Sequence, residues 1–270
     1  MLKISYKIKG LHLIESWFAS KVPMGKISLL RLCCYRDSRV DINIFGLKKE
    51  KKYTLINDLT QEEVDIFSDF KPNVRNEIRK HTKIDNFLHH SGYKSKRVFL
   101  EFYKKFAEAK GLTPIKEHSI DKYGDNLFYI QGSLDGVLTN IQVYIVDKES
   151  GTVRLLHSIS KLYERDSGMG GFSPKEEDAK SIVSKFCKKS NRQRETRIGW
   201  INRYLHWHTM LHFKDKGFKT FDWGGYSNDI NSPLAGIDKF KASFGGTKIE
   251  LYDYYTLPYY AIKVLQERIL

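Results

Sequence analysis

The sequence has few cysteines and no long hydrophobic run. Its 270 residues include three cysteines, of which Cys33 and Cys34 are adjacent and Cys187 stands apart. Adjacent cysteines are too close for ordinary disulfide geometry, and an odd total gives no disulfide framework, so we expect a reducing compartment. No apolar stretch approaches the roughly 20 residues that cross a bilayer, and the first ten residues alternate lysine with apolar side chains. We therefore expect a cytoplasmic protein without a signal peptide or transmembrane segment.

Two catalytic patterns are also missing from the sequence. It contains no nucleophile elbow of the kind that Ser-His-Asp or Cys-His hydrolases use. His208 and His212 have the four-residue spacing of a zinc-binding helix, but no Glu follows His208 and no third ligand stands nearby. Because both histidines fall on the apolar side of a predicted helix, we interpret them as core or pocket residues and expect no bound metal.

Acidic residues are outnumbered by basic ones. Lys and Arg total 46 and Asp and Glu total 32, which gives a net charge of +14. Such an excess attracts nucleic acid, anionic lipid or nucleotide-linked substrates, although a lysine-rich surface can also serve solubility alone. The charge gathers in residues 48–52, 75–83, 94–97, 185–189 and 192–197. We expect an anionic partner, with peripheral membrane contact as one alternative.

The N-terminal quarter of the chain predicts short strands and two helices. Hydrophobic residues make up 41% of the chain and aromatic residues 13%, enough for a globular core. Runs of β-favouring residues separated by turn formers predict strands over 2–8, 27–34, 40–45 and 53–56. Thr60 with Glu63 forms a capping box that predicts a helix toward Phe70. Pro72 suits the first turn of a second helix.

That second helix has an apolar side and a cationic side. Val74 and Ile78 are its apolar positions, and the cations follow at helical spacing: Arg75, Arg79, Lys80 and Lys83. A solvated basic face is one interpretation. The other is a phosphate-binding helix, in which Arg75 and Arg79 contact an anionic substrate.

The middle of the chain predicts a helix over 99–109 that Gly111 ends, followed by β-rich runs over 131–146 and 152–163. The turn formers between these runs predict an antiparallel hairpin. Residues 164–190 include a glycine-rich run and a charged run, which predict an exposed loop. Apolar residues at helical spacing from Ile201 to His212 then predict an amphipathic helix that Gly217 ends.

A strand and a dense group of turn formers follow that helix. Residues 218–223 alternate apolar and polar side chains as a strand does. Asp222, Gly224, Gly225 and Asn228 belong to the turn-forming segment after it. Strand ends are common ligand sites in α/β sheets, so polar groups here are candidates for a binding site.

These segments resemble the Fem-type branch of the GNAT acyltransferase superfamily. The similarity lies in Asn202–Trp207, in the aromatic-Asp-aromatic-Gly-Gly segment Phe221–Tyr226, in Phe240-Lys241 and in Phe244–Gly246, in this order. The helix entry Arg75–Lys80 is also similar. The resemblance implies an α/β (α+β) fold with a mixed, mostly antiparallel sheet flanked by helices. It also implies an abbreviated αβ portion over 1–70 and a GNAT-like acyltransferase domain over 71–270.

The resemblance leaves two acyl donors open. Acyl-CoA-dependent members hold the pyrophosphate on a glycine-rich loop that opens the central helix. The equivalent segment here, Thr196–Ile201, keeps one glycine, Gly199, so Arg194 and Arg197 are expected to hold phosphates by side chain. Fem-type members instead take the acyl group from aminoacyl-tRNA. In both cases the donor, tRNA or CoA, is a co-substrate, and no permanently bound cofactor is expected.

The resemblance also implies roles for residues near the strand end. Lys241 matches the lysine thought to stabilise the oxyanion. Asp222 could orient or deprotonate the incoming amine, or instead cap the Gly-Gly turn, and Tyr226 is a candidate proton donor. His206 and Asn228 are candidate substrate-binding residues, and His206 is expected to face a cleft.

The sequence thus predicts an N-acyltransferase. It would move an acyl or aminoacyl group to an amine of a glycan, peptide or nucleotide-linked precursor in cell-envelope or polysaccharide synthesis. The alternatives are an acyl-CoA-dependent N-acetyltransferase for an amino sugar or small molecule, and a non-catalytic, basic nucleic-acid-binding protein on the same fold.

Overall fold

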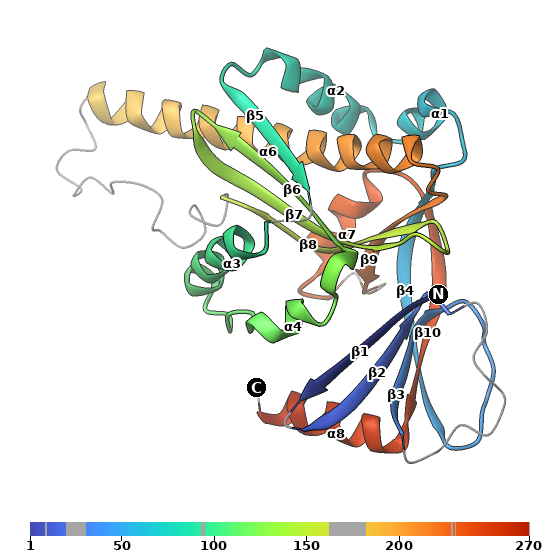
Figure 1. Cartoon of the computed structure of the whole chain (residues 1–270). Coiled ribbons are helices and arrows are strands. Elements are labelled where there is room, and N and C mark those ends of the chain that lie inside the picture. Colours follow the sequence, from blue (N-terminus) through green and yellow to red (C-terminus); the bar gives the residue numbers. More distant parts are fainter. Residues whose placement is uncertain are drawn as a thin grey trace. The chain divides into compact units, whose positions relative to one another are not determined.

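The computed structural model describes residues 1–8, 10–19, 31–92, 95–161, 182–227, 229 and 231–269 (Figure 1). The chain forms two compact units that alternate along the sequence. Unit 1 comprises Met1–Asp69, Val146–Arg154 and Lys216–Leu270, and unit 2 comprises Phe70–Ile145 and Leu155–Asp215. The division of the chain into portions over 1–70 and 71–270 stays a prediction.

Unit 1 is built on strands β1 (Leu2–Ile8), β2 (Leu11–Trp17), β3 (Leu32–Ser38), β4 (Leu47–Asp58), β9 (Thr220–Tyr226) and β10 (Thr247–Thr256). Their order is β1-β2-β3-β10-β4-β9, and the start of β8 (Thr152–Ser160) pairs with β9. The β2–β3 and β8–β9 pairs are parallel, whereas β1–β2, β3–β10, β10–β4 and β4–β9 are antiparallel. The helices of this unit are α1 (Glu63–Ser68), α7 (Ala235–Ala242) and α8 (Leu257–Ile269).

Unit 2 is built on strands β5 (Phe87–Gly92), β6 (Leu127–Leu134) and β7 (Val137–Asp147) with the rest of β8, in the order β8-β7-β6-β5. Its helices are α2 (Pro72–Lys80), α3 (Lys96–Lys110), α4 (Glu117–Asp121) and α6 (Ile182–Asp215), with short 3-10 turns at His81–Lys83 (η1) and Gly124–Asn126 (η2). The fold class predicted from the sequence, a mixed and mostly antiparallel sheet flanked by helices, is confirmed.

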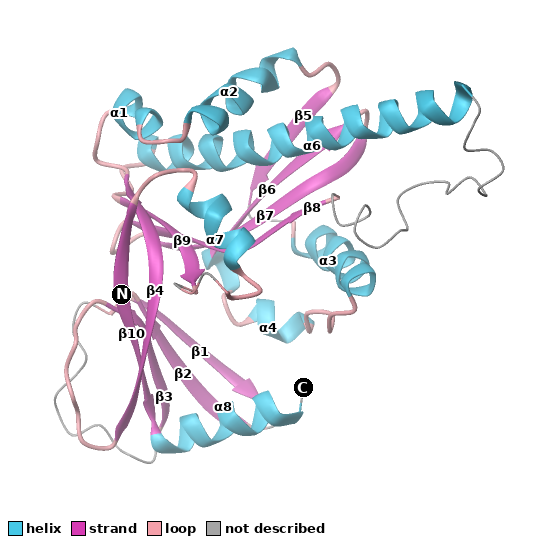
Figure 2. Cartoon of the chain, turned by 180° about the vertical axis from the view of Figure 1, so that it is seen from behind, coloured by secondary structure: helices cyan, strands magenta, loops and turns pink. Residues whose placement is uncertain are grey.

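Neighbouring residues of β6 show how the helices of unit 2 cover both faces of its strands. Phe128 packs against Phe213 of α6, with ring centroids 5.0 Å apart. Tyr129 packs against Phe99 of α3, with centroids 6.1 Å apart. Because successive side chains of a strand point to opposite faces, α6 lies on one face and α3 on the other, as Figure 2 shows.

Helix α6 is amphipathic as predicted, but its buried side is rotated from the predicted stripe, because Tyr204 and Leu211 are only half-buried. Its core-facing side includes four residues with 0% of their surface exposed: Ile201, Leu205, Met210 and Phe213. Gly217, just beyond the helix, has a positive φ of 78°, which a residue with a side chain adopts at a cost. The predicted end of this helix is therefore correct.

Several local predictions were wrong. The run over 131–146 is not one strand, because Asp135 and Gly136 both have positive φ and close a tight turn between β6 and β7. The described residues 39–46 form no strand. The capping box is also absent: Glu62 is the N-cap of α1, and Thr60 Oγ1 instead donates to Asp58 at 2.7 Å. The predicted loop over 164–190 lies largely outside the described residues, and from Ile182 onward it is helix α6.

Candidate active site

The end of β9 is held in shape by the carboxylate of Asp222. Its Oδ1 accepts hydrogen bonds from the backbone N–H of Gly224 at 2.8 Å and from Thr54 Oγ1 at 2.5 Å. Gly224 has a φ of 73°, and the pairing register of β4 with β9 shifts at this point. Asp222 thus caps the Gly-Gly turn, one of the two roles expected from the sequence. Its contact with an acceptor amine stays a prediction.

The other carboxylate oxygen of Asp222 belongs to a buried ion pair. Arg154 of β8 places Nη1 2.5 Å from Asp222 Oδ2 and 3.2 Å from Asp37 Oδ2. Burial opposes the charge of Arg154, but Asp222 and Asp37 outweigh it and raise the pKa of the guanidinium. Lys52 extends the network, with Nζ 2.5 Å from Asp37 and 2.6 Å from Asp253. The network therefore joins side chains of five strands: β3, β4, β8, β9 and β10.

Lys241 brings a cation to the Gly-Gly turn. It lies in the last turn of α7, and its Nζ donates to the carbonyl of Gly225 at 2.5 Å. Burial lowers the pKa of Lys241, and nearby Arg154 lowers it further. An ammonium carries three N–H donors, so the one that binds Gly225 leaves two that could meet a developing negative charge.

Helix α7 is itself attached to the segment after β9. Asp238 is 6% exposed, and its Oδ2 accepts from the backbone N–H of Ser227 at 3.1 Å and from the Ser227 hydroxyl. Asp238 and Lys241 stand three residues apart, so they share one side of the helix. The position of Lys241 at the turn is therefore set by a second, independent contact.

The Phe-Gly-Gly segment after α7 packs tightly against neighbouring backbone of unit 1. Gly245 and Gly246 have φ values of 67° and 84°. A Cβ at Gly246 would lie 2.5 Å from the carbonyl oxygen of Ile56, and one at Gly245 would lie 2.7 Å from that of Asp69. Only glycine fits both the backbone conformation and the space. Phe244 is fully buried against Trp223, with ring centroids 4.6 Å apart.

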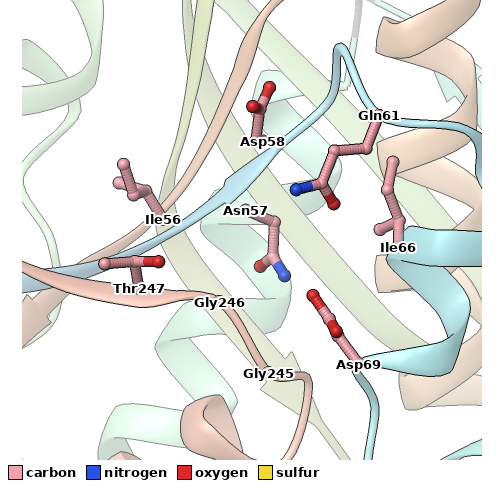
Figure 3. Close-up of a pocket in the computed structure, with 9 residues that line it drawn as sticks. All are labelled: Ile56, Asn57, Asp58, Gln61, Ile66, Asp69, Gly245, Gly246 and Thr247. Carbon is pink, nitrogen blue, oxygen red and sulfur yellow. The ribbon is translucent and has the colours of Figure 1, made fainter.

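A cavity of about 280 Å³ lies beside this segment in unit 1. Figure 3 shows the side chains of Asn57, Gln61 and Asp69 directed toward the space next to Gly245 and Gly246. Its walls also include Ile56, Asp58, Ile66 and Thr247. Two carboxylates and two amides suit a cationic or hydrogen-bonding group better than an anion.

The remaining predicted site residues of unit 1 lie at or after the end of β9. Tyr226 is the last residue of the strand, is half-buried, and pairs with Tyr53 of β4. Its role as a proton donor stays a prediction. Asn228 lies outside the described residues.

The segment equivalent to the phosphate loop of acyl-CoA-dependent members is helical. Helix α6 runs through Thr196–Ile201, including Gly199, and the backbone N–H groups inside a helix bind its own carbonyls. This segment therefore offers no backbone cradle for a pyrophosphate. Phosphate binding by side chain stays a prediction: Arg197 lines a groove described below, and the exposed Arg194 is not among the residues that line it.

Three predicted substrate-binding residues lie in unit 2: Arg75, Arg79 and His206. Arg75 donates from Nη1 to the carbonyl of Phe70 at 2.7 Å, and Arg79 is exposed. His206, which was expected to face a cleft, is fully buried. It is 0% exposed, its Nδ1 lies 3.0 Å from the Tyr144 hydroxyl, and its Nε2 lies 3.3 Å from Ser158 Oγ. Substrate contact by these three residues stays a prediction.

The other histidines of α6, His208 and His212, are half-buried against aromatic rings. His212 stacks on Phe128 with centroids 5.0 Å apart, and His208 is half-buried beside His89 at 4.5 Å. Burial lowers the pKa of His208 to about 4. Within the described part of the chain, no three His, Cys, Asp or Glu side chains come together as a metal site. No described helix is both long and apolar enough to cross a membrane.

Arg154 and Thr54 were missed by sequence reasoning. Arg154 is a charged residue inside the apolar run of β8, between two buried residues, Val153 and Leu155. A buried charge requires a partner, so this position carried a readable signal. The partner itself could not be identified from the sequence, because Arg154 and Asp222 are far apart along the chain.

The fold is shared with known proteins although the sequence is not. No protein-family model and no curated protein matches the chain. The crystal structure of FemX is similar with a TM-score of 0.60 and 11% identity, over 97% of this chain and 85% of FemX. L-PGS from Bacillus licheniformis is similar with a TM-score of 0.52 and 14% identity, over 98% of this chain and 84% of that one. The chain thus shares the fold of FemX, in agreement with the Fem-type resemblance of its motifs.

Proposed function

We propose that this chain is an N-acyltransferase of the Fem type. It would transfer an acyl or aminoacyl group to an amine of a glycan, peptide or nucleotide-linked precursor in cell-envelope or polysaccharide synthesis, in the cytoplasm. The observation that carries the proposal is the partly buried ammonium of Lys241, held at the carbonyl of Gly225 beside the strand-end turn. A fixed cation with spare donors is what acyl transfer needs where negative charge develops.

The reaction would proceed by attack of the acceptor amine on the acyl carbonyl carbon. A C–N bond forms, and the carbonyl oxygen becomes an oxyanion that Lys241 stabilises. The bond from carbon to the leaving group then breaks, and the leaving oxygen or sulfur takes a proton from Tyr226 as the candidate donor. The amine nitrogen releases its extra proton to solvent, and Tyr226 regains a proton from solvent. Asp222 and Arg154 hold the turn that presents the Gly225 carbonyl, so we assign them a positioning role.

The donor is either aminoacyl-tRNA or acyl-CoA. Helix α6 is continuous through Thr196–Ile201 and offers no backbone cradle of the kind that holds CoA in acyl-CoA-dependent members, which favours the RNA-linked donor. CoA-dependent transfer to an amino sugar is the second candidate, because the arginines of α6 could hold phosphates without a loop.

The test is a transfer assay with the purified chain. Radiolabelled aminoacyl-tRNA and acetyl-CoA would each be offered with a nucleotide-linked muramyl pentapeptide and with glucosamine. Lys241→Met keeps the length of the side chain but removes the charge, and we expect kcat to fall about 100-fold or more. Lys239→Met, an exposed position on the same helix, is the matched control and should keep wild-type kcat.

Either of two outcomes would count against the proposal. Absence of transfer from both donors to any offered amine would remove the enzyme assignment and favour a non-catalytic nucleic-acid-binding protein. Transfer that Lys241→Met leaves intact would keep the enzyme but remove Lys241 from the reaction. A thermal unfolding curve for each variant separates loss of chemistry from loss of fold.

A further inference from the structure

A second cavity lies in unit 2, between the end of α2 and the N-terminal half of α6. Its volume is about 570 Å³, within the range of roughly 300–1,000 Å³ typical of small-molecule sites. The residues that line it are Lys80, Lys83, Arg192, Gln193, Thr196, Arg197 and Trp200. Helices α2 and α6 lie alongside each other in both views (Figures 1 and 2). We refer to this cavity as the cationic groove.

The cationic groove has four positive side chains and no acidic lining residue among those the structure describes. The acid nearest to it on α2, Glu77, pairs with Arg203 of α6 at 3.0 Å. Glu195 falls on a different side of α6 from the lining residues, because residues advance by about 100° each around a helix. The positive charge of the groove is therefore not neutralised by its own walls.

An aromatic ring lies among these cations. Trp200 is half-buried, and Lys80 Nζ is 5.1 Å from the centroid of its indole ring. Gln193 and Thr196 add hydrogen-bonding groups on the same side of the helix. Cations that meet phosphates, next to an aromatic face on which a base can stack, are the combination that binds nucleotide chains without reading their sequence.

We propose that the cationic groove binds a phosphorylated nucleotide, with its phosphates on Lys83, Arg192 and Arg197 and its base against Trp200. Two sources carry this chemistry: the single-stranded end of an RNA such as tRNA, and CoA. The inference rests on the proposed function, because it states where the donor of that reaction is held. It can nevertheless be tested by binding alone, without turnover.

The positions of the cations around helix α6 distinguish this proposal from binding by the overall positive charge of the protein. Residues 192, 193, 196, 197 and 200 share one side of the helix, whereas Arg194 falls on another. Binding by overall charge would not depend on which cations are removed, since the counterion effect counts charges. Binding in the groove depends on position.

The experiment compares two double variants with the same change in charge. Lys83→Glu/Arg192→Glu alters two exposed groove residues, and Lys71→Glu/Lys105→Glu alters two exposed lysines of unit 2 away from the groove. Equilibrium binding would be measured with bulk tRNA, a 12-nucleotide single-stranded RNA and CoA, each at two salt concentrations. Trp200→Leu would test the stacking contact, and thermal unfolding would confirm that each variant folds.

We expect the groove variant to lose at least tenfold in affinity and to show a shallower salt dependence, while the control variant stays within about twofold of wild type. Trp200→Leu should lose about fivefold or more. If the loss affects RNA, the ligand is RNA, and if it affects CoA, the ligand is CoA. The proposal would be overturned if both double variants lost affinity equally, or if the groove variant lost affinity for neither RNA nor CoA. Transfer activity that persists in such a case would leave the proposed function standing.

Discussion

The two charged regions of this protein differ in how their charges are balanced. Around β9 in unit 1, Arg154, Asp222 and Asp37 are at least 93% buried and bind one another. In the cationic groove of unit 2, Lys83 and Arg192 are exposed, and the lining residues that the structure describes include no carboxylate. A buried network of paired charges fixes geometry, because removing either partner leaves an uncompensated charge. Exposed cations without acidic partners cost little and remain available to a ligand.

Separating Arg154 from its partner should have the largest effect. Asp222→Asn leaves the buried guanidinium without its closest carboxylate, and we expect a loss of about 4 kcal/mol in unfolding free energy. Urea unfolding followed by circular dichroism would measure it. Asp222→Asn/Arg154→Met, which removes both charges, should recover part of the loss. A single variant as stable as wild type would show that the network does not hold the turn.

The tight packing at the Phe-Gly-Gly segment should come next. Gly246→Ala places a Cβ 2.5 Å from the Ile56 carbonyl oxygen at a positive φ, and we expect a loss of about 3 kcal/mol from strain and displacement together. Gly236→Ala in α7, where a Cβ has nothing within 4 Å, is the matched control and should be neutral or stabilising. Similar melting temperatures for the two variants would contradict this account of the segment.

Acid should destabilise unit 2 through His157. This ring packs against Phe99 with centroids 5.3 Å apart, and burial lowers its pKa to about 4 from an ordinary 6.5. The unfolded chain therefore binds more protons between these values, and stability falls as pH decreases from about 6.5 to about 4, by at most about 3 kcal/mol. His157→Phe should reduce this slope in urea unfolding at several pH values. An unchanged slope would assign the acid sensitivity to other groups.

The smallest predicted change is a shift in the alkaline limit of transfer. Because burial lowers the pKa of Lys241 below its ordinary 10.5, the cation that stabilises the oxyanion is lost earlier as pH rises. We expect kcat to decline on the alkaline side below pH 10.5 and expect Lys241→Arg, which stays charged, to remove that decline. If kcat depends on pH in the same way in wild type and in Lys241→Arg, the alkaline decline is not caused by Lys241.

The sequence predicted features that depend on near neighbours. Strand Leu2–Ile8, the helix that Pro72 opens and the helix ends at Gly111 and Gly217 all follow from local pattern and backbone chemistry. The turn at Asp135-Gly136 carried a similar signal that was overlooked. Helix α6 was underestimated, although Ile182, Val183, Phe186 and Cys187 stand at helical spacing in its first two turns.

Features that join distant segments were not predicted. Strand β10 pairs with both β3 and β4, and no local pattern states which strands become neighbours. The same limit applies to the candidate site: Lys241 and Asp222 were chosen from a motif, but Arg154 was not. Of the groove residues, Arg197 was predicted from the sequence as one of several phosphate-binding arginines. That residues of α2 line the same groove became evident only from the packing of α2 against α6.

The most direct test of a division between chemistry and donor binding measures kcat, KM for the donor and donor affinity in two variants. Lys241→Met should lower kcat about 100-fold or more and leave affinity near wild type, whereas Lys83→Glu/Arg192→Glu should weaken affinity and raise KM at least tenfold with little change in kcat. If both variants lower kcat and affinity together, the two regions are not functionally separate, and this account is wrong.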